Sequence, residues 1–170
     1  MRLLNRSFAV AAVLCAVIGA PGCGPEVDLA KSVEIVAVSS GYYDMGVVNG
    51  KSKIVPETII EVKNIGSRNL PGFQMSATFW AAGDDAEKAE KIVPHLVAKD
   101  LAPGATSEPI VLRSDFGYTP EMSRSEAFAS SYFKDFTAKV FGKVGGRIAK
   151  LGEVTIERKI LPKDGLDPTK

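Results

Sequence analysis

From Val33 onward, apolar and polar residues alternate in short runs, and clusters of Gly, Pro, Asn and Asp separate the runs. Alternation with a period of two is typical of β-strands that bury one face. It predicts seven strands, at residues 33–40, 57–64, 73–81, 91–98, 108–113, 133–141 and 153–160. The clearest is 73–81 (FQMSATFWA), where Phe73, Met75, Ala77 and Phe79 share the inward face.

The second predicted strand turns Thr58, Ile60 and Val62 inward and Glu57 toward solvent. Pro94 and Pro109 confine their strands to sheet edges or strand ends, because proline cannot donate to the strand ladder. Seven alternating strands indicate an all-β fold, an antiparallel β-sandwich in which one face of each sheet is buried.

Two connections have recognisable local signals. Gly145-Gly146 predicts a tight hairpin turn, because both residues tolerate positive φ. The segment 120–130 predicts a short helix, with Thr119 as its N-cap and Pro120 in its first turn.

The amino-acid composition argues against two classes of function, nucleic-acid binding and zinc binding. The chain has 170 residues, with 21 Lys and Arg against 20 Asp and Glu, and this balance disfavours nucleic-acid binding, which needs a basic excess. With one His and two Cys in the whole chain, the composition argues strongly against a zinc site of three or four His and Cys ligands. The length fits one domain.

The N-terminus has the pattern of a secretion signal. Arg2 and Arg6 precede a 13-residue apolar run at 8–20, which is shorter than the roughly 20 residues needed to span a bilayer. The run is followed by the small residues Ala20-Pro21-Gly22 and then by Cys23. This arrangement resembles a bacterial lipoprotein signal, whose cysteine receives a diacylglycerol on sulfur and, after cleavage, an acyl chain on its new amine.

The resemblance implies that residues 1–22 are removed, that acylated Cys23 attaches the chain to a membrane, and that 23–32 is a tether. Gly24 is not the Asp that such sorting systems read as a retention signal, which favours the outer membrane if the cell has one. Two alternatives stay open, a soluble secreted form beginning at Cys23 and an uncleaved anchor. The domain is then predicted at 33–161, with a tail at 162–170, in the bacterial cell envelope.

A second resemblance lies between residues 54 and 113. The motifs V-K-N-I-G at 62–66, L-P-G-F at 70–73 and L-A-P-G at 101–104 resemble the immunoglobulin-like modules of bacterial envelope proteins, including the CARDB and FxLYD-type domains. These motifs are turns: Asn64 and Gly66 are predicted in left-handed conformations, and Pro103-Gly104 in a reverse turn. The resemblance implies that the antiparallel sandwich is an immunoglobulin-like β-sandwich, and it implies no ligand.

No catalytic set is recognisable. His95 is the sole imidazole and is predicted as a half-exposed strand residue. The acidic loop around Asp84 and Asp85 lacks the spacing of a calcium loop. The sequence therefore predicts no enzyme, no metal and no cofactor.

If consecutive strands alternate direction, the loops 41–53, 82–90 and 114–131 share the end of the sandwich that points away from Cys23. These loops carry the candidate binding residues Tyr42, Tyr43, Asp44, Phe116 and Tyr118. Loops on a rigid scaffold, with Tyr offering area and a polar group, are typical of binding surfaces. The alternative is that these aromatic side chains only cap the core.

The sequence thus predicts a non-catalytic binding module that meets an envelope protein or a cell-wall polymer through these loops. The alternative function is a structural subunit that pairs an edge strand with a neighbour's sheet.

Overall fold

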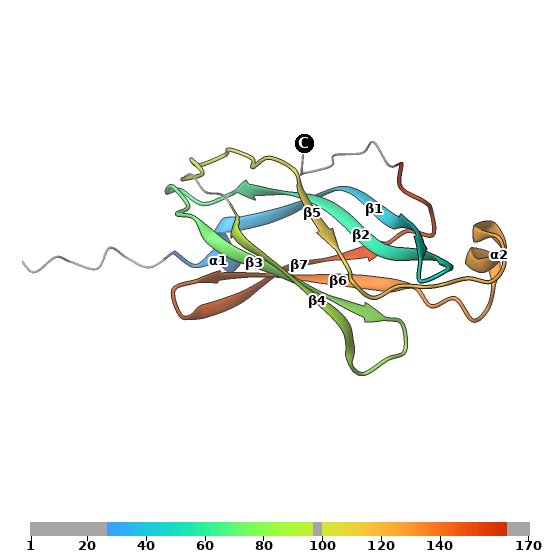
Figure 1. Cartoon of the computed structure of the whole chain (residues 1–170). Helices are drawn as coiled ribbons and strands as arrows, with labels where there is room; N and C mark the ends of the chain where they lie inside the picture. The colour runs from blue at the N-terminus through green and yellow to red at the C-terminus, as the bar shows by residue number, and fades with distance from the viewer. Residues whose placement is uncertain (1–26, 97–99, 163–170) are drawn as a thin grey trace, which may run out of the picture.

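The computed structural model describes residues 27–96 and 100–162, which form two antiparallel sheets packed face to face (Figure 1). The three-stranded sheet has the order β1 (Val33–Val48), β2 (Lys51–Asn64), β5 (Ile110–Arg113). The four-stranded sheet has the order β4 (Glu87–Leu96), β3 (Phe73–Ala81), β6 (Phe136–Val144), β7 (Arg147–Ile156). A helical turn, α1 (Leu29–Ser32), precedes β1, and a short helix, α2 (Arg124–Ala129), lies between β5 and β6. The prediction of an all-β sandwich of seven strands with a short helix is confirmed.

The strand order is immunoglobulin-like. β1, β2 and β5 form one layer, β3, β6 and β7 form the other, and β4 extends the second layer beside β3. The core lies between the layers and includes all the inward residues predicted for β3, which are at most 4% exposed. As the two prolines indicated, β4 and β5 are edge strands.

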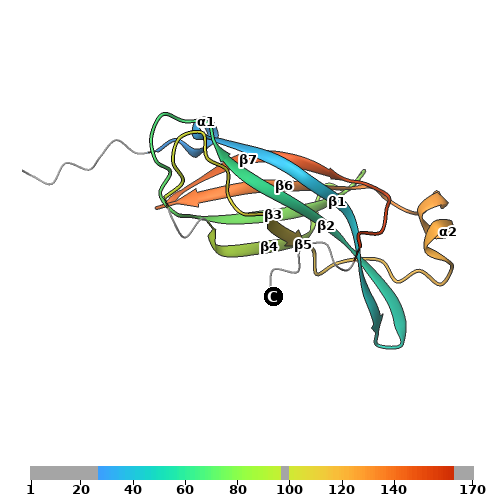
Figure 2. The same ribbon diagram turned by 90° about the horizontal axis from the view of Figure 1, so that it is seen from above.

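The hairpin of β1 and β2 is longer than predicted. Residues 41–53 were expected to be a loop, but both strands continue through them to a two-residue turn at Asn49-Gly50. Both turn residues have positive φ, 50° and 77°, as a tight hairpin of this kind requires. Figure 2 shows the end of this hairpin projecting away from the sandwich.

Helix α2 begins later than predicted. Its N-cap is Ser123 and not Thr119, because Ser123 and Glu126 form a capping box in which each side chain accepts a hydrogen bond from the other residue's backbone N–H. The hairpin turn at Gly145-Gly146 is as predicted, with Val144 and Arg147 paired across it.

The folded domain also begins earlier than the predicted boundary at Val33. Leu29 of α1 is 3% exposed and belongs to the core, so the end of the predicted tether is part of the sandwich. Residues 1–22, Cys23 and 163–170 lie outside the described residues.

Glu57 was predicted to face solvent, and this is wrong. Its side chain is 2% exposed, on the face of β2 opposite the core, and pairs with Arg113 of β5. Burial raises the pKa of Glu57, and the hydrogen bond and positive charge of Arg113 act in the opposite direction.

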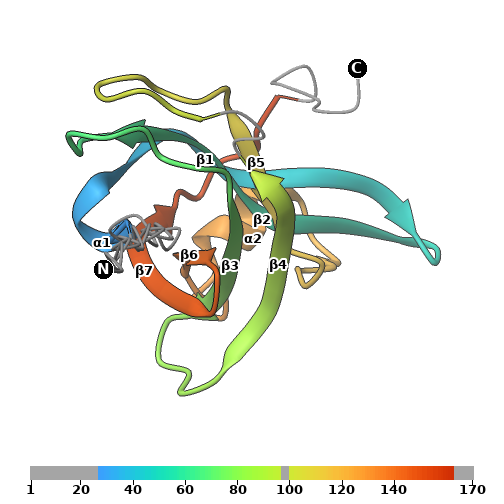
Figure 3. The same cartoon turned by 90° about the vertical axis from the view of Figure 1, so that its left-hand side faces the viewer.

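The connections gather at two ends, as predicted. The β1–β2 turn, the β3–β4 turn and α2 lie at one end, called here the distal end (Figure 1). α1, the connections 65–72 and 100–109, and the β6–β7 turn lie at the opposite, proximal end, which faces the viewer in Figure 3.

Asn64 organises the proximal end in an unexpected way. Neither Asn64 nor Gly66 has positive φ, so the predicted left-handed turn is wrong. Instead, the fully buried Asn64 amide donates to the carbonyls of Arg68 and Leu101, both at 2.8 Å, and its oxygen accepts from the Gly66 N–H at 2.9 Å. One side chain thus holds two connections together.

Candidate functional site

The predicted binding residues of β1 are not in a loop, because β1 extends to Val48. Tyr42 points inward and is fully buried among aromatic rings, with centroids 5.1 Å from Phe133, 5.3 Å from Phe128 and 6.5 Å from Tyr118. Tyr42 therefore caps the distal end of the core and presents no surface to a partner.

Tyr43 and Asp44 lie elsewhere. The ring of Tyr43 is half-buried, with the Arg113 guanidinium 3.4 Å from its centroid. The carboxylate of Asp44 accepts from the Gly46 N–H at 2.9 Å and from the side chain of Arg124, which ties β1 to α2. Both side chains have structural partners.

Phe116 and Tyr118 join the same aromatic cluster as Tyr42. Tyr118 stacks on Phe133 at 4.4 Å, and both Phe116 and Tyr118 lie about 6 Å from Phe136. The Tyr118 hydroxyl accepts from the backbone N–H of Lys134 at 3.1 Å. Phe116 remains 43% exposed. Of the five predicted residues, these two reach the surface of the cluster.

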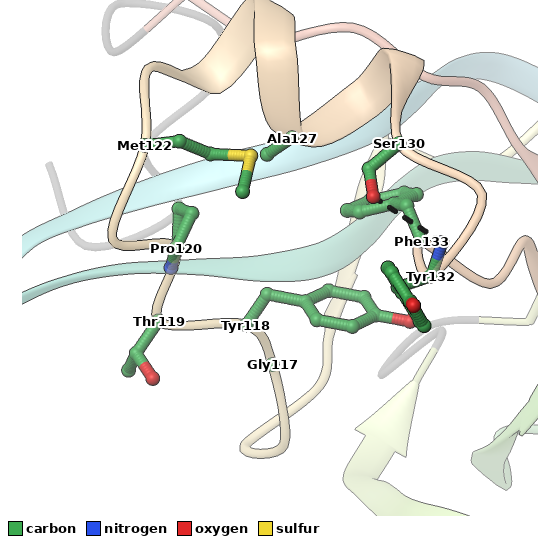
Figure 4. Close-up of a pocket in the computed structure, with 9 residues that line it drawn as sticks. All are labelled: Gly117, Tyr118, Thr119, Pro120, Met122, Ala127, Ser130, Tyr132 and Phe133. Atoms are coloured by element: carbon green, nitrogen blue, oxygen red, sulfur yellow. Dashed lines mark hydrogen bonds between the residues drawn. The ribbon is translucent and has the colours of Figure 1, made fainter.

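An open pocket of about 310 Å³ adjoins the cluster, between the segment 117–122 and α2 (Figure 4). In Figure 4 the ring of Tyr118 lies between Pro120 and Met122 on one side and Tyr132 and Phe133 on the other. The lining is mostly apolar, and its side-chain hydroxyl groups belong to Thr119, Ser130 and the two tyrosines. Its size is at the lower end of the range for ligand sites, so it accommodates one large side chain or one ring of a ligand.

Two exposed residues at this pocket were not predicted. Met122 is 52% exposed and Tyr132 is 92% exposed. Both stand in polar surroundings in the sequence, MSRS and SSYF, outside any alternating pattern. A tyrosine in the polar segment after a predicted helix was the only available signal.

The pocket wall formed by residues 128–135 is fastened by Arg158. Its guanidinium donates to the carbonyls of Phe128 at 2.6 Å and Phe133 at 3.1 Å, and to both oxygens of Asp135. Its hydrogen bond and positive charge lower the pKa of Asp135. These bonds join the segment 128–135 to the chain after β7.

A salt bridge connects the segment 128–135 to the β3–β4 turn. Lys134 and Lys88 both pair with Asp84, and their hydrogen bonds lower the pKa of this carboxyl group. The acidic loop considered for calcium therefore has its Asp84 oxygens occupied by ammonium groups.

Among the side chains that the structure describes, at residues 27–92 and 100–162, no group of three or more His, Cys, Asp or Glu is arranged to hold a metal ion. In the same part of the chain, no helix is long and apolar enough to cross a membrane. His95 lies in β4, and its side chain is not among those that the structure describes.

No protein-family model matches the chain, and a search of curated proteins finds no match either. The resemblances to lipoprotein signals and to CARDB and FxLYD-type modules therefore stay predictions from the motifs themselves.

Proposed function

We propose that this chain is a lipid-anchored protein of the bacterial cell envelope that binds a partner at its distal end and performs no catalysis. The observation that carries the proposal is the open apolar pocket beside the exposed Tyr132, at the end opposite the one where the described chain begins. An anchor at one end and a binding surface at the other would present that surface away from the membrane.

The anchor is supported by the cysteine positions. Cys15 lies within the apolar run that the signal peptidase would remove, so the processed chain carries a single cysteine, Cys23, as its first residue. An unpaired thiol is a liability in an oxidising compartment, and acylation removes it. Two or three acyl chains also give stable attachment, whereas a single chain gives marginal attachment.

The binding surface is supported by residue type and exposure. A tyrosine that is 92% exposed leaves most of its ring in water, and a partner that covers the ring gains apolar burial at a low cost in side-chain entropy. The pocket beside it would receive one apolar or planar group of an envelope protein or a cell-wall polymer. The proposed binding residues are thus Phe116, Tyr118, Met122 and Tyr132.

Capture of partners from envelope extracts tests the binding surface. The double variant M122A/Y132A is expected to lose capture and to keep its melting temperature, because Tyr132 is almost fully exposed and Met122 is half-exposed. The control variant is Ile92→Ala, which removes a half-exposed side chain from β4. Equal capture by the double variant and the wild type would refute the proposed surface.

The anchor is tested separately by mass spectrometry of the N-terminal peptide. A mass increase that matches diacylglyceryl and acyl groups on Cys23 is the expected result. An unmodified Cys23 would contradict the anchor without affecting the binding surface.

The alternative, a structural subunit that pairs through an edge strand, is favoured by one observation. β1 is an edge strand whose backbone at Tyr42 already pairs in parallel with residues 159–161, through bonds from the Tyr42 N–H to Lys159 and from the Leu161 N–H to Tyr42. Nearer the proximal end, Val36 and Val38 on the same strand are 38% and 49% exposed.

A stoichiometric complex that survives M122A/Y132A but is lost in V36K/V38K would support this alternative, because charged residues on an edge strand oppose strand addition.

A further inference from the structure

We propose that the proximal end of the sandwich lies directly on the bilayer that holds Cys23, with Ile65 and Ile148 inserted among the lipid headgroups. This inference rests on the acyl anchor proposed above. It adds a second contact between protein and membrane, and hence a fixed orientation of the distal pocket.

The first argument is the reach of the chain. Only Gly24, Pro25 and Glu26 separate Cys23 from Val27, the first described residue. Four residue steps of about 3.5 Å reach at most about 14 Å even when fully extended. Leu29 is already packed in the core, so the body of the domain cannot lie far from an acylated Cys23. One end of the sandwich must therefore adjoin the headgroup layer.

The second argument is the position of two exposed isoleucines beside this entry point. The backbone N–H of Ile65 donates to the carbonyl of Ser32 at 2.9 Å, next to α1, and the Ile65 side chain is 53% exposed. Ile148 is 68% exposed and lines a hollow of about 260 Å³ together with Val27 and Leu29. Branched aliphatic side chains at both flanks of the chain's entry are suited to insertion into an interface.

The third argument is the charge difference between the two ends. Among the described residues of the proximal end, 27–34, 62–72, 100–108 and 143–150, there are six Lys and Arg against four Asp and Glu. The corresponding distal segments, 43–53, 82–88, 114–135 and 157–161, have seven against nine. An anionic lipid surface attracts the first set and repels the second, so this difference favours the same orientation as the tether.

Depth-dependent fluorescence quenching tests the inference on the full chain. The chain is produced in bacteria and reconstituted into vesicles of phosphatidylethanolamine and phosphatidylglycerol. Its introduced thiol, from Ile65→Cys or Ile148→Cys, is labelled with an environment-sensitive fluorophore. Acylated Cys23 does not react with the label. The matched control is Val47→Cys, which replaces a 75% exposed aliphatic residue near the tip of the β1–β2 hairpin.

A lipid that carries a quencher just below the headgroups should remove at least about half of the emission at positions 65 and 148, since interfacial side chains lie about 5–10 Å deep. Position 47 should keep its emission. Mass spectrometry of the N-terminal peptide is measured on the same samples, so that the anchor and the docking are tested independently.

Four results would overturn the inference. If Cys23 is acylated and positions 65 and 148 keep their emission, docking is wrong and the anchor stands. If Cys23 is unmodified, the anchor and the docking that depends on it are both wrong. Equal quenching at all three positions would mean that the domain lies on its side. Shielding of positions 65 and 148 from both lipid-borne and aqueous quenchers would mean that a protein covers this end.

Discussion

Tyr42 offers the sharpest test of how the distal end is built. Its ring packs against Phe128 and Phe133, but its buried hydroxyl has no hydrogen-bond partner among the protein atoms that the structure describes. Burying a hydroxyl without a partner costs about 1–3 kcal/mol. The variant Tyr42→Phe keeps the ring and removes the uncompensated oxygen, so it should stabilise the fold by about that amount.

The assay is urea unfolding followed by the emission of Trp80, the single tryptophan of the chain. The urea midpoint should rise at an unchanged slope, and the melting temperature should rise by about 3–9 °C. The companion variant Tyr42→Ala removes the ring and should cost about 3–5 kcal/mol. A loss of about 1 kcal/mol or more in Tyr42→Phe would refute the reasoning, because the hydroxyl would then have a stabilising partner.

The pH dependence of stability gives the same variant a second readout. Burial raises the pKa of Tyr42, so the folded chain keeps the phenol proton at pH values where the unfolded chain releases it. The folded state then binds more protons, and stability falls as the pH rises above the ordinary tyrosine value of about 10. Tyr42→Phe should lose this part of the alkaline destabilisation. A decline identical to that of the wild type would show that Tyr42 does not contribute to it.

Three further predictions concern other positions. Asn64→Ala removes three hydrogen bonds of a fully buried side chain and should cost about 2–4 kcal/mol in urea unfolding. The control Asn69→Ala, at an exposed position of the next connection, should cost little, and equal effects would contradict the role given to Asn64. Arg113→Met leaves the buried carboxylate of Glu57 without its cation and should lower the free energy of unfolding by about 3 kcal/mol at neutral pH. The loss should be smaller in acid, where Glu57 is protonated, and a loss independent of pH would argue against this pairing. Tyr132→Ala alone should weaken partner capture several-fold in a pull-down without changing the melting temperature, and unchanged capture would remove Tyr132 from the binding surface.

The fold was accessible from the sequence because its signals are local. Alternation with a period of two located the strands, and the inward residues of β3 and β6 are buried as predicted. The glycine pair at 145–146 located a hairpin turn that depends only on the local backbone. Even the grouping of loops at two ends followed from the simple alternation of strand direction.

The predictions failed where contacts between residues far apart in the sequence determine the local structure. Gly41 falls in the segment 41–53 that the sequence predicts as a loop, but it lies within β1, where a Cβ atom would stand 2.8 Å from the carbonyl oxygen of Lys159. The need for glycine there comes from a segment more than a hundred residues away. Asn64 was likewise assigned a backbone role, whereas its side chain bonds the carbonyl of Leu101 in another connection.

The same distinction between local and long-range signals applies to the residues of the candidate site. The sequence located the distal end and two of its exposed or half-buried aromatic residues, Phe116 and Tyr118. It could not show that Tyr42 is buried and Tyr132 exposed. The β5–β6 connection covers Tyr42 and carries Tyr132 on its surface, so the exposure of both residues depends on how residues 114–135 fold over the sandwich.

The central claim is that the distal pocket binds a partner in the cell envelope. Its most direct test is photocrosslinking in intact cells, with a photoreactive amino acid at position 132 and, as a control on another exposed surface, at position 92. A discrete crosslinked product at position 132 that is absent at position 92 is the predicted result. No product at position 132, or the same products at both positions, would contradict the claim.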